Sequence, residues 1–361
     1  MKDTEFAIIG AGPAGLSAAI EAASAGVDVT LIDENEKPGG QLFKQIHKFF
    51  GSKDHYAGTR GIDIGANLLN QVKSSGANVM LDSVVWGIFK NHTLGIIREE
   101  KNHLLTAQKI LVATGAVENA LNFPGWTMSG VMGAGAIQTM VNVHRVLPGK
   151  KILIIGAGNV GLIVSYQLLQ AGAEVVAIVE AANKVGGYAV HASKVHRQGV
   201  PIYVSTTIKE ARGNNKVEEA VLVSLDEDWE QIEGTERSLK VDVICLACGL
   251  TPLAELLWMA GVKFNHIPQL GGYIPVHDDN LQSSIPGLYI AGDVAGVEEA
   301  STAIEEGRLV GVAIAESLGK LSSLEAERKK KKIQKRINDL RSEPFREAIR
   351  SAKNGQIYGG D

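Results

Sequence analysis

The fold is decided by residues 6–34, which read FAIIGAGPAGLSAAIEAASAGVDVTLIDE. The short apolar run 6–9 is typical of a strand buried on both faces of a parallel sheet. Three glycines follow it. Gly10 permits a tight turn, Gly12 lets a diphosphate approach the backbone, and Gly15 lets the next helix pack on the strand. We therefore predict a strand–turn–helix–strand unit that binds a dinucleotide.

An acid at the end of the second predicted strand, residues 27–32, strengthens this interpretation. Asp33 follows the glycines by about 20 residues, where a carboxylate can accept a hydrogen bond from a ribose hydroxyl. Pro13 and Ala14 in the first helical turn, and Glu34 beside the acid, complete the predicted cofactor contacts. The alternative is a glycine-rich turn that binds nothing, and the flanking strand, helix and acid disfavour it.

Composition indicates an ordinary folded protein with two domains. The chain has 361 residues, of which 45% are hydrophobic, 21% are charged and 41 are glycine. A formal net charge of −4 indicates neither nucleic acid nor membrane as a partner. The first strand begins close to Met1, and no apolar run reaches about 18 residues. With only two cysteines, we expect a cytoplasmic protein without a targeting peptide, a transmembrane helix or a disulfide framework.

The two cysteines, Cys245 and Cys248, are spaced as C-x-x-C, which raises the alternative of a redox dithiol. They lie in residues 241–249, VDVICLACG, an apolar run typical of a buried strand that ends in a turn. A free cysteine in such a place usually packs as a small hydrophobic residue. No electropositive helix N-terminus is indicated that would lower the thiol pKa, so we interpret both as packing residues.

The opening pattern repeats in residues 151–180, KILIIGAGNVGLIVSYQLLQAGAEVVAIVE. The repeat predicts a second nucleotide-binding unit. Glu180 ends its second strand as Asp33 ends the first, and an acid there favours NAD or another adenine nucleotide over NADP. His196 and Arg197 farther along leave NADP disfavoured rather than excluded. The predicted contacts of this unit are Gly156, Gly158, Asn159, Gly161 and Glu180.

Two further strands end in glycine-containing turns. The strand predicted at 109–112 runs into Ala113-Thr114-Gly115, and the one at 288–291 runs into Gly292-Asp293 ahead of a helix that starts near Ala300. A small residue at a strand end lets a ligand approach closely. The alternative for Asp293 is a structural cap. A helix at 62–74 and a small antiparallel meander are also predicted, with strands at 78–81, 84–89, 93–98 and 103–107.

Together these motifs resemble the flavoproteins with two dinucleotide-binding domains, and in particular the thioredoxin-reductase-like architecture. The resemblance covers about residues 4–318 and rests on GAGPAG, GGQL at 39–42, ATG, GAGNVG and the late AGD. Residues 39–52, GGQLFKQIHKFFGS, and 123–140, FPGWTMSGVMGAGAIQTM, are most similar to the α subunits of heteromeric amine-oxidising flavoenzymes. That group includes sarcosine oxidase, opine oxidase, dye-linked proline or hydroxyproline dehydrogenase, and hydrogen cyanide synthase.

The resemblance implies an α/β fold of two Rossmann-like domains, the second inserted in the first. The FAD-binding domain would comprise residues 1–117 and 252–318, and the NAD-type nucleotide-binding domain residues 118–251. Residues 319–361 would form a basic helical C-terminal tail.

The same resemblance implies how FAD is held. Gly10, Gly12, Gly15 and Asp33 would hold the ADP half, and Asp293 would bind the ribityl or pyrophosphate region. A helix that begins at Ala300 and Ser301 would direct its positive end to the flavin N1 and O2. No catalytic acid, base, nucleophile or metal ligand is implied. Beside the isoalloxazine or the dinucleotide would lie Gly40, Gln41, Leu42, Thr114 and Gly115.

Two departures from the resemblance restrict the function. Where thioredoxin reductases carry a redox-active C-x-x-C, residues 131–136 read VMGAGA, which rules out disulfide reduction. Residues 319–361 contain no cysteine, so any iron–sulfur cluster would belong to another chain. The resemblance implies a FAD-containing, substrate-oxidising partner subunit and allows a small iron–sulfur subunit and an FMN at a subunit interface.

Three functions stay open. The first is an FAD-dependent, electron-relaying α subunit of a heteromeric amino-acid or imino-acid dehydrogenase or oxidase. The second is a self-sufficient NADH:acceptor flavin oxidoreductase, and the third is a nucleotide-holding structural subunit. We expect a partner to dock on residues 41–60, which include His47, His55 and Arg60, and on the basic tail. The alternative for the tail is a solvated helix laid on the body through Ile333, Ile337 and Leu340.

Overall fold

The computed structural model describes residues 2–342 and 347–354. The chain divides into two compact units, which we describe separately. Unit 1 comprises Met1–Val117 and Leu250–Asp361, and unit 2 comprises Glu118–Gly249. Two short paired strands, β7 (Ala116–Glu118) and β16 (Leu250–Pro252), lie where the chain passes between the units.

Unit 1 is organised on one mixed sheet of seven strands. Strands β1, β2, β3, β6 and β19 pair in parallel. Strands β4 and β5 extend the sheet in antiparallel fashion beyond β6. The strands are β1 (Lys2–Ile9), β2 (Val29–Ile32), β3 (Asn78–Met80), β4 (Ser83–Phe89), β5 (Thr93–Arg98), β6 (Lys101–Val112) and β19 (Leu288–Ile290).

Two details of this sheet differ from the sequence prediction. Residues 78–80 belong to the parallel part, because β3 pairs with β2 and not with the meander. The strands predicted at 103–107 and 109–112 are one continuous strand, β6. Its first half pairs with the antiparallel β5, and its last residues pair with the parallel β19.

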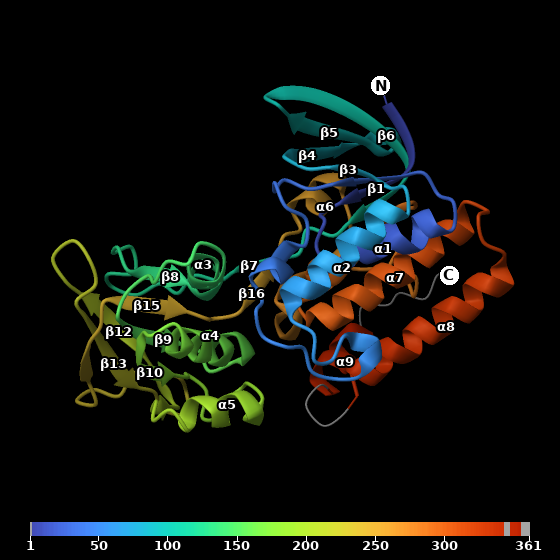
Figure 1. The fold of residues 1–361 in the computed structure, drawn as a ribbon. Coiled ribbons are helices and arrows are strands. Elements are labelled where there is room, and N and C mark those ends of the chain that lie inside the picture. The colour runs from blue at the N-terminus through green and yellow to red at the C-terminus, as the bar shows by residue number, and fades with distance from the viewer. Residues whose placement is uncertain (1, 343–346, 355–361) are drawn as a thin grey trace. The chain divides into compact units, whose positions relative to one another are not determined.

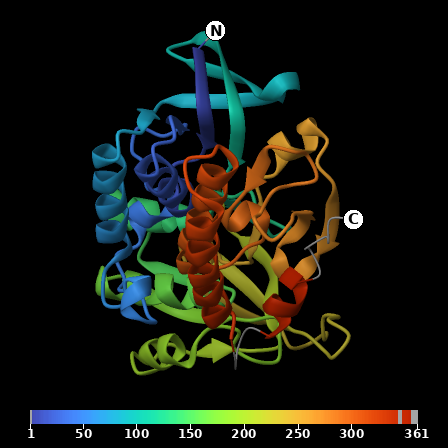
Figure 2. The same cartoon turned by 90° about the vertical axis from the view of Figure 1, so that its right-hand side faces the viewer.

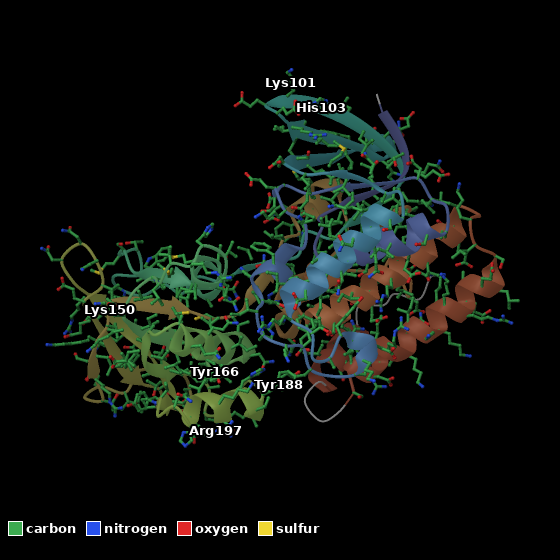
Figure 3. All side chains as sticks on the ribbon, in the orientation of Figure 1. Lys101, His103, Lys150, Tyr166, Tyr188 and Arg197 are labelled. Carbon is green, nitrogen blue, oxygen red and sulfur yellow. The ribbon has the colours of Figure 1, made fainter. Side chains whose placement is uncertain are left out.

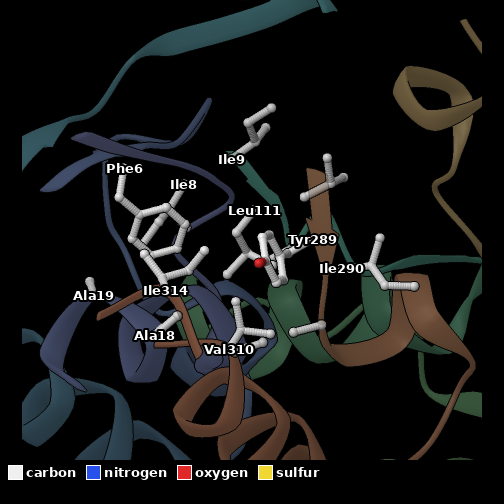
Figure 4. Packing of buried hydrophobic residues seen from close by; sticks show 14 of the residues in the cluster. Phe6, Ile8, Ile9, Ala18, Ala19, Leu111, Tyr289, Ile290, Val310 and Ile314 are labelled. Carbon is white, nitrogen blue, oxygen red and sulfur yellow. The ribbon is translucent and has the colours of Figure 1, made fainter. Parts of the chain in front are cut away.

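Two helices pack on this sheet and on each other, α1 (Pro13–Ser24) and α7 (Ala300–Ser317). Glycines on α7 make the contact close, since a Cβ at Gly307 would overlap with the Ala14 carbonyl oxygen. Figure 4 shows the core between them, where Phe6, Ile8, Val310 and Ile314 meet. The other helices of this unit are α2 (Gly61–Ser74), α6 (Glu255–Ala260), α8 (Ser323–Leu340) and α9 (Glu347–Asn354).

Short elements complete unit 1. A hairpin joins β17 (Phe264–Ile267) to β18 (Gly272–Pro275). The 3₁₀ turns are η1 (Gly40–Lys44), η2 (Lys53–His55), η3 (Lys90–His92), η5 (Pro268–Leu270) and η6 (Gly292–Ala295).

Helix α8, the first helix of the basic tail, packs against the rest of unit 1 rather than extending into solvent. Helix α8 begins with a capping box, in which the Ser322 hydroxyl accepts from the Glu325 N–H and the Glu325 carboxylate accepts from the Ser322 N–H. It lies beside α7 (Figures 1 and 2) and buries Ile333 and Ile337, two of the residues predicted at helical spacing. The tail therefore belongs to the structure of unit 1.

Unit 2 repeats the architecture of unit 1 on a smaller scale. Its central sheet has the order β11-β10-β9-β15-β8, with all neighbours parallel. These strands are β8 (Val131–Gly133), β9 (Lys151–Ile155), β10 (Glu174–Val179), β11 (Ile202–Tyr203) and β15 (Val243–Leu246). The other elements are α3 (Ala134–Gln138), the π-helical turn η4 (Thr139–Val143), α4 (Asn159–Gln170), α5 (Ala189–His196), and an antiparallel meander of β12 (Thr206–Arg212), β13 (Glu219–Ser224) and β14 (Arg237–Lys240).

Both units therefore have a core of parallel strands with helices packed on it, which confirms the predicted α/β class. Within the described residues, none of the helices combines the length and apolar character that crossing a bilayer requires.

Candidate functional site

The first candidate site lies at the carboxyl edge of the unit 1 sheet. Ile9, Val112 and Ile290 are aligned across β1, β6 and β19. Each strand is followed at once by a segment that the sequence analysis singled out. The glycine turn, the Thr114–Gly115 turn and Gly292–Asp293 therefore leave the sheet at the same edge, where parallel α/β sheets bind their ligands.

The three glycines of the first turn occupy distinct environments. A Cβ on Gly10 would overlap with the Ala113 carbonyl oxygen, and a Cβ on Gly15 would overlap with that of Gly10. A Cβ on Gly12 would meet no protein atom within 4 Å. Gly10 and Gly15 are thus required by packing, whereas Gly12 faces space that a diphosphate can fill.

Asp33 is fixed beside this turn. Its Oδ2 accepts from the Ala11 N–H at 2.6 Å, and its Oδ1 accepts from the backbone and side-chain nitrogens of Asn35, both at 2.9 Å. The side chain is buried at the end of β2. Glu34, the next residue, is exposed. Asp33 is therefore placed beside the amides that would bind phosphate, as a ribose-binding acid requires.

The GGQL segment covers the same turn. The Gly39 N–H donates to the Ala11 carbonyl at 2.8 Å, and a Cβ on Gly40 would come within 2.9 Å of the Gly12 Cα. Gln41 is exposed, while Leu42 is buried in the core. Of these residues, Gly40 and Gln41 remain accessible to a cofactor at the turn.

Asp293 follows β19 in η6, ahead of α7. Burial raises the pKa of Asp293 to about 6, and the Glu298 N–H, which donates to Oδ1 at 3.4 Å, offsets this only in part. Glu306 raises the pKa further and Lys353 lowers it.

The remaining predicted contacts lie at helix starts. Pro13 and Ala14 begin α1, and Ala300 and Ser301 begin α7.

We expect Asp293→Asn to stabilise the ligand-free protein at neutral pH by about 1–3 kcal/mol. The folded pKa of about 6 lies above the usual 3.8, so the folded state binds this proton more tightly than the unfolded state. The free energy of unfolding therefore falls as pH rises from about 4 to about 6, and the loss is complete above that range. Urea unfolding of both proteins at several pH values measures the effect. If the difference in the free energy of unfolding between the two proteins is unchanged at about pH 4, it does not come from the ionisation of Asp293.

Unit 2 contains a second site with matching geometry. A Cβ on Gly158 would again meet nothing within 4 Å. A Cβ on Gly156 would overlap with the Ala247 carbonyl oxygen, and a Cβ on Gly161 would overlap with that of Gly156. The Glu180 carboxylate accepts from the N–H groups of Ala157 at 2.8 Å and of Ala182 at 3.1 Å. Glu180 thus repeats the contact that Asp33 makes in unit 1.

Asn159 fixes the start of α5 at this second turn. Its Oδ1 accepts from the Tyr188 N–H at 2.8 Å. Arg197 is exposed beyond the other end of the helix (Figure 3), about 12 Å farther along at 1.5 Å per residue. His196 and Arg197 are therefore not placed at the start of α5, where the glycine turn lies.

Sequence reasoning missed two parts of the second site. The Gly187 N–H donates to the Ala157 carbonyl at 2.9 Å, as Gly39 does to Ala11. Residues 247–249 follow β15 as 113–115 follow β6, with Ala247 donating to Ile155 at 2.8 Å and Gly249 at a φ of +92°. The available signals were the repeats K-x-G-G, at 37–40 and 184–187, and A-x-G, at 113–115 and 247–249.

The cysteines do not form a redox site. Cys245 is fully buried in β15, and burial raises its pKa. Burial also raises the pKa of Cys248 to about 11. A thiol protonated at neutral pH is a poor nucleophile, so the pair is unsuited to thiol–disulfide exchange.

Comparison with known proteins agrees with this geometry. The family model described as "Pyridine nucleotide-disulphide oxidoreductase" matches residues 4–307. An opine oxidase subunit of Rhizobium meliloti (strain 1021) is 28% identical over 339 residues, which cover 87% of this chain and 71% of the relative. The HcnB subunit of hydrogen cyanide synthase from Pseudomonas aeruginosa is 28% identical over 326 residues, 85% of this chain and 70% of the relative. The chain therefore spans about 70% of the length of both.

A solved structure shares the fold. The thioredoxin reductase of T. acidophilum superposes with a TM-score of 0.72 at 21% identity, covering 88% of this chain and all of that one. The predicted resemblance to thioredoxin-reductase-like flavoproteins and to the amine-oxidising α subunits is thereby confirmed.

Proposed function

The chain belongs to the pyridine nucleotide-disulphide oxidoreductase family, and from that premise we propose that it is the electron-relaying α subunit of a heteromeric amino-acid or imino-acid dehydrogenase or oxidase. It is an FAD-dependent oxidoreductase. The observation that carries the proposal is a complete pair of nucleotide sites in a chain without a usable dithiol.

The residues at the unit 1 edge fit FAD. The open space at Gly12 accepts the diphosphate, and Asp33 accepts from the adenosine ribose. Asp293 and the first turn of α7 receive the ribityl chain and the flavin ring. When bound, FAD supplies the two-electron chemistry, while these residues bind and orient it and set its electrostatic surroundings.

The unit 2 site fits an adenine nucleotide with a free 2′-hydroxyl. Glu180 presents a carboxylate where the ribose would lie, and a 2′-phosphate there would meet like charge. We therefore assign NAD(H) or another adenine nucleotide to this site.

The unmodified chain is expected to bind NADH at least about tenfold more tightly than NADPH, since like charges in close contact cost several kcal/mol. Glu180→Arg should erode or reverse this preference. Calorimetry with both nucleotides measures it. Glu174→Arg, at the opposite end of β10, makes the same charge change away from the turn and should leave the preference intact. Tighter NADPH binding by the unmodified protein would overturn the assignment.

The partner would oxidise the substrate. The two relatives are named as subunits, of an opine oxidase and of a hydrogen cyanide synthase, which supports a heteromeric assembly for this chain. The chain divides into two compact units, and we assign a nucleotide site to each of them, which supports placing the substrate site in another subunit. We infer a FAD-containing, substrate-oxidising partner. A small iron–sulfur subunit and an interface FMN remain proposals, and so does docking on residues 41–60, where Phe50 is 52% exposed.

One observation favours a second function, a self-sufficient NADH:acceptor oxidoreductase. The second site is complete in its glycines, its acid and its Ala247–Gly249 turn, so it can hold NADH. The two functions are distinguished by the rate at which NADH and amino acids reduce the flavin of the isolated chain, with and without the partner.

A further inference from the structure

Helix α7 carries two buried carboxylates, and the tail neutralises both. Glu305 and Glu306 are 0% and 2% exposed. Arg336 on α8 donates to Glu305 at 2.7 Å, and Arg308 on α7 donates to it at 2.6 Å. Glu306 is paired instead with Arg341 at 2.7 Å and with Lys353 on α9 at 3.1 Å. Each carboxylate thus has two cations.

The second of these groups also holds the backbone segment 292–299. Glu306 Oε2 accepts from the Gly292 N–H at 2.9 Å, at the start of the segment. Lys353 Nζ donates to the Ala295 carbonyl at 2.9 Å, in its middle. Towards its end, Glu298 accepts from Arg341 at 2.6 Å and pairs with Lys353 at 3.3 Å. Lys353 and Arg341 thus contact the start of the segment through Glu306, and they bind its middle and end directly.

The packing of the Lys353 side chain also places it against segment 292–299. A Cβ on Gly296 would come within 3.2 Å of Lys353 Cε, so the lysine stem lies against the segment at a glycine whose φ is +125°. The Lys353 side chain is 3% exposed. Burial acts to raise the pKa of Glu306, but Lys353 and Arg341 outweigh it and hold that pKa below its usual value. Lys353, Arg341 and the Gly292 N–H thus all favour the charged form of this carboxylate.

We propose that Lys353 and Arg341 are positioning residues that hold segment 292–299 in the conformation that receives the ribityl and pyrophosphate groups of FAD. The inference rests on the FAD site proposed above. It gives the tail a role in cofactor binding in addition to its packing on α7.

The test compares two variants that break similar pairs. Lys353→Met leaves Glu306 with Arg341, and Arg336→Met leaves Glu305 with Arg308. Both should lower the melting temperature, because each leaves a buried charge with one partner fewer. Only Lys353→Met should weaken FAD binding, by about tenfold or more, since Glu305 makes no contact with segment 292–299 among the contacts described above. The measurements are FAD titration by fluorescence and thermal unfolding of the full chain.

Two further readouts separate positioning from stability. Lys353→Met should shift the flavin midpoint potential to a more negative value, because the group formed by Glu298, Glu306, Arg341 and Lys353 at the FAD-binding segment loses one positive charge, while Arg336→Met should not. The double variant Glu306→Gln/Lys353→Met removes both charges but still lacks the Lys353 contacts to Ala295 and Glu298, so it should bind FAD about as weakly as Lys353→Met. If Lys353→Met fails to fold, Arg341→Met, which removes the other cation that contacts Glu298 and Glu306, takes its place.

The proposal is overturned if Lys353→Met and Arg336→Met weaken FAD binding equally, or if neither does. It is also overturned if the double variant recovers the FAD affinity of the unmodified protein, because the loss in Lys353→Met would then come from an unpaired buried charge and not from the lost contacts to the segment. A variant with a bulky residue at Gly12 tests the FAD site independently. If that variant loses FAD while Lys353→Met retains it, only the positioning role fails.

Discussion

Replacing Gly12 with leucine is expected to leave a folded but colourless protein. A side chain there would occupy the diphosphate position and weaken FAD binding more than about a hundredfold, equivalent to about 3 kcal/mol. Folding should be unaffected for two reasons. Gly12 has a φ of −73°, which any residue adopts, and its Cβ would meet no protein atom within 4 Å. Visible flavin absorbance, calorimetry with FAD and thermal unfolding give the answer.

Gly158→Leu is the matched control, because Gly158 has the same open surroundings and a φ of −73° in unit 2. It should lose the adenine nucleotide of the second site and keep FAD. Heat should release FAD from the unmodified protein and from Gly158→Leu. Retention of FAD by Gly12→Leu would place the flavin elsewhere and remove the basis of the site described above.

The glycine turns could be predicted from sequence because their chemistry is local. Gly10, Gly12 and Gly15 follow a buried strand. A Cβ would overlap with a backbone carbonyl oxygen at Gly10 and Gly15, and it would meet open space at Gly12. The acids Asp33 and Glu180 were identified for the same reason, since each ends the strand next to its turn.

Long-range contacts could not be predicted in this way. Arg341, Lys353 and Glu306 are far apart in sequence and come together only because α8 packs on α7 and α9 reaches segment 292–299. Charge alone indicated a solvated or docking tail, since lysines and arginines are usually exposed. The Gly187 contact had a sequence signal, the repeated K-x-G-G, whose meaning became clear only from the backbone hydrogen bond to Ala157.

The rate of flavin reduction by amino acids is expected to depend strongly on the substrate-oxidising partner subunit. If the chain is a relay subunit, amino acids should reduce its flavin slowly in the isolated chain and at least about a hundredfold faster once the substrate-oxidising subunit is bound. The reason is that oxidation of a C–N bond requires a pocket that holds the substrate carboxylate and amine beside a flavin, and we propose that the partner supplies this pocket. Rapid mixing of the reconstituted enzyme with candidate amino acids measures the rate. Equal rates with and without the partner would show that the chain has its own substrate site.

The most direct test of the relay function is anaerobic mixing of the isolated, FAD-loaded chain with NADH while the flavin absorbance is followed. We expect the flavin to stay oxidised for minutes, although NADH binds at the second site. Bleaching within seconds, reversed by an artificial acceptor, would contradict it and establish a self-sufficient NADH:acceptor oxidoreductase.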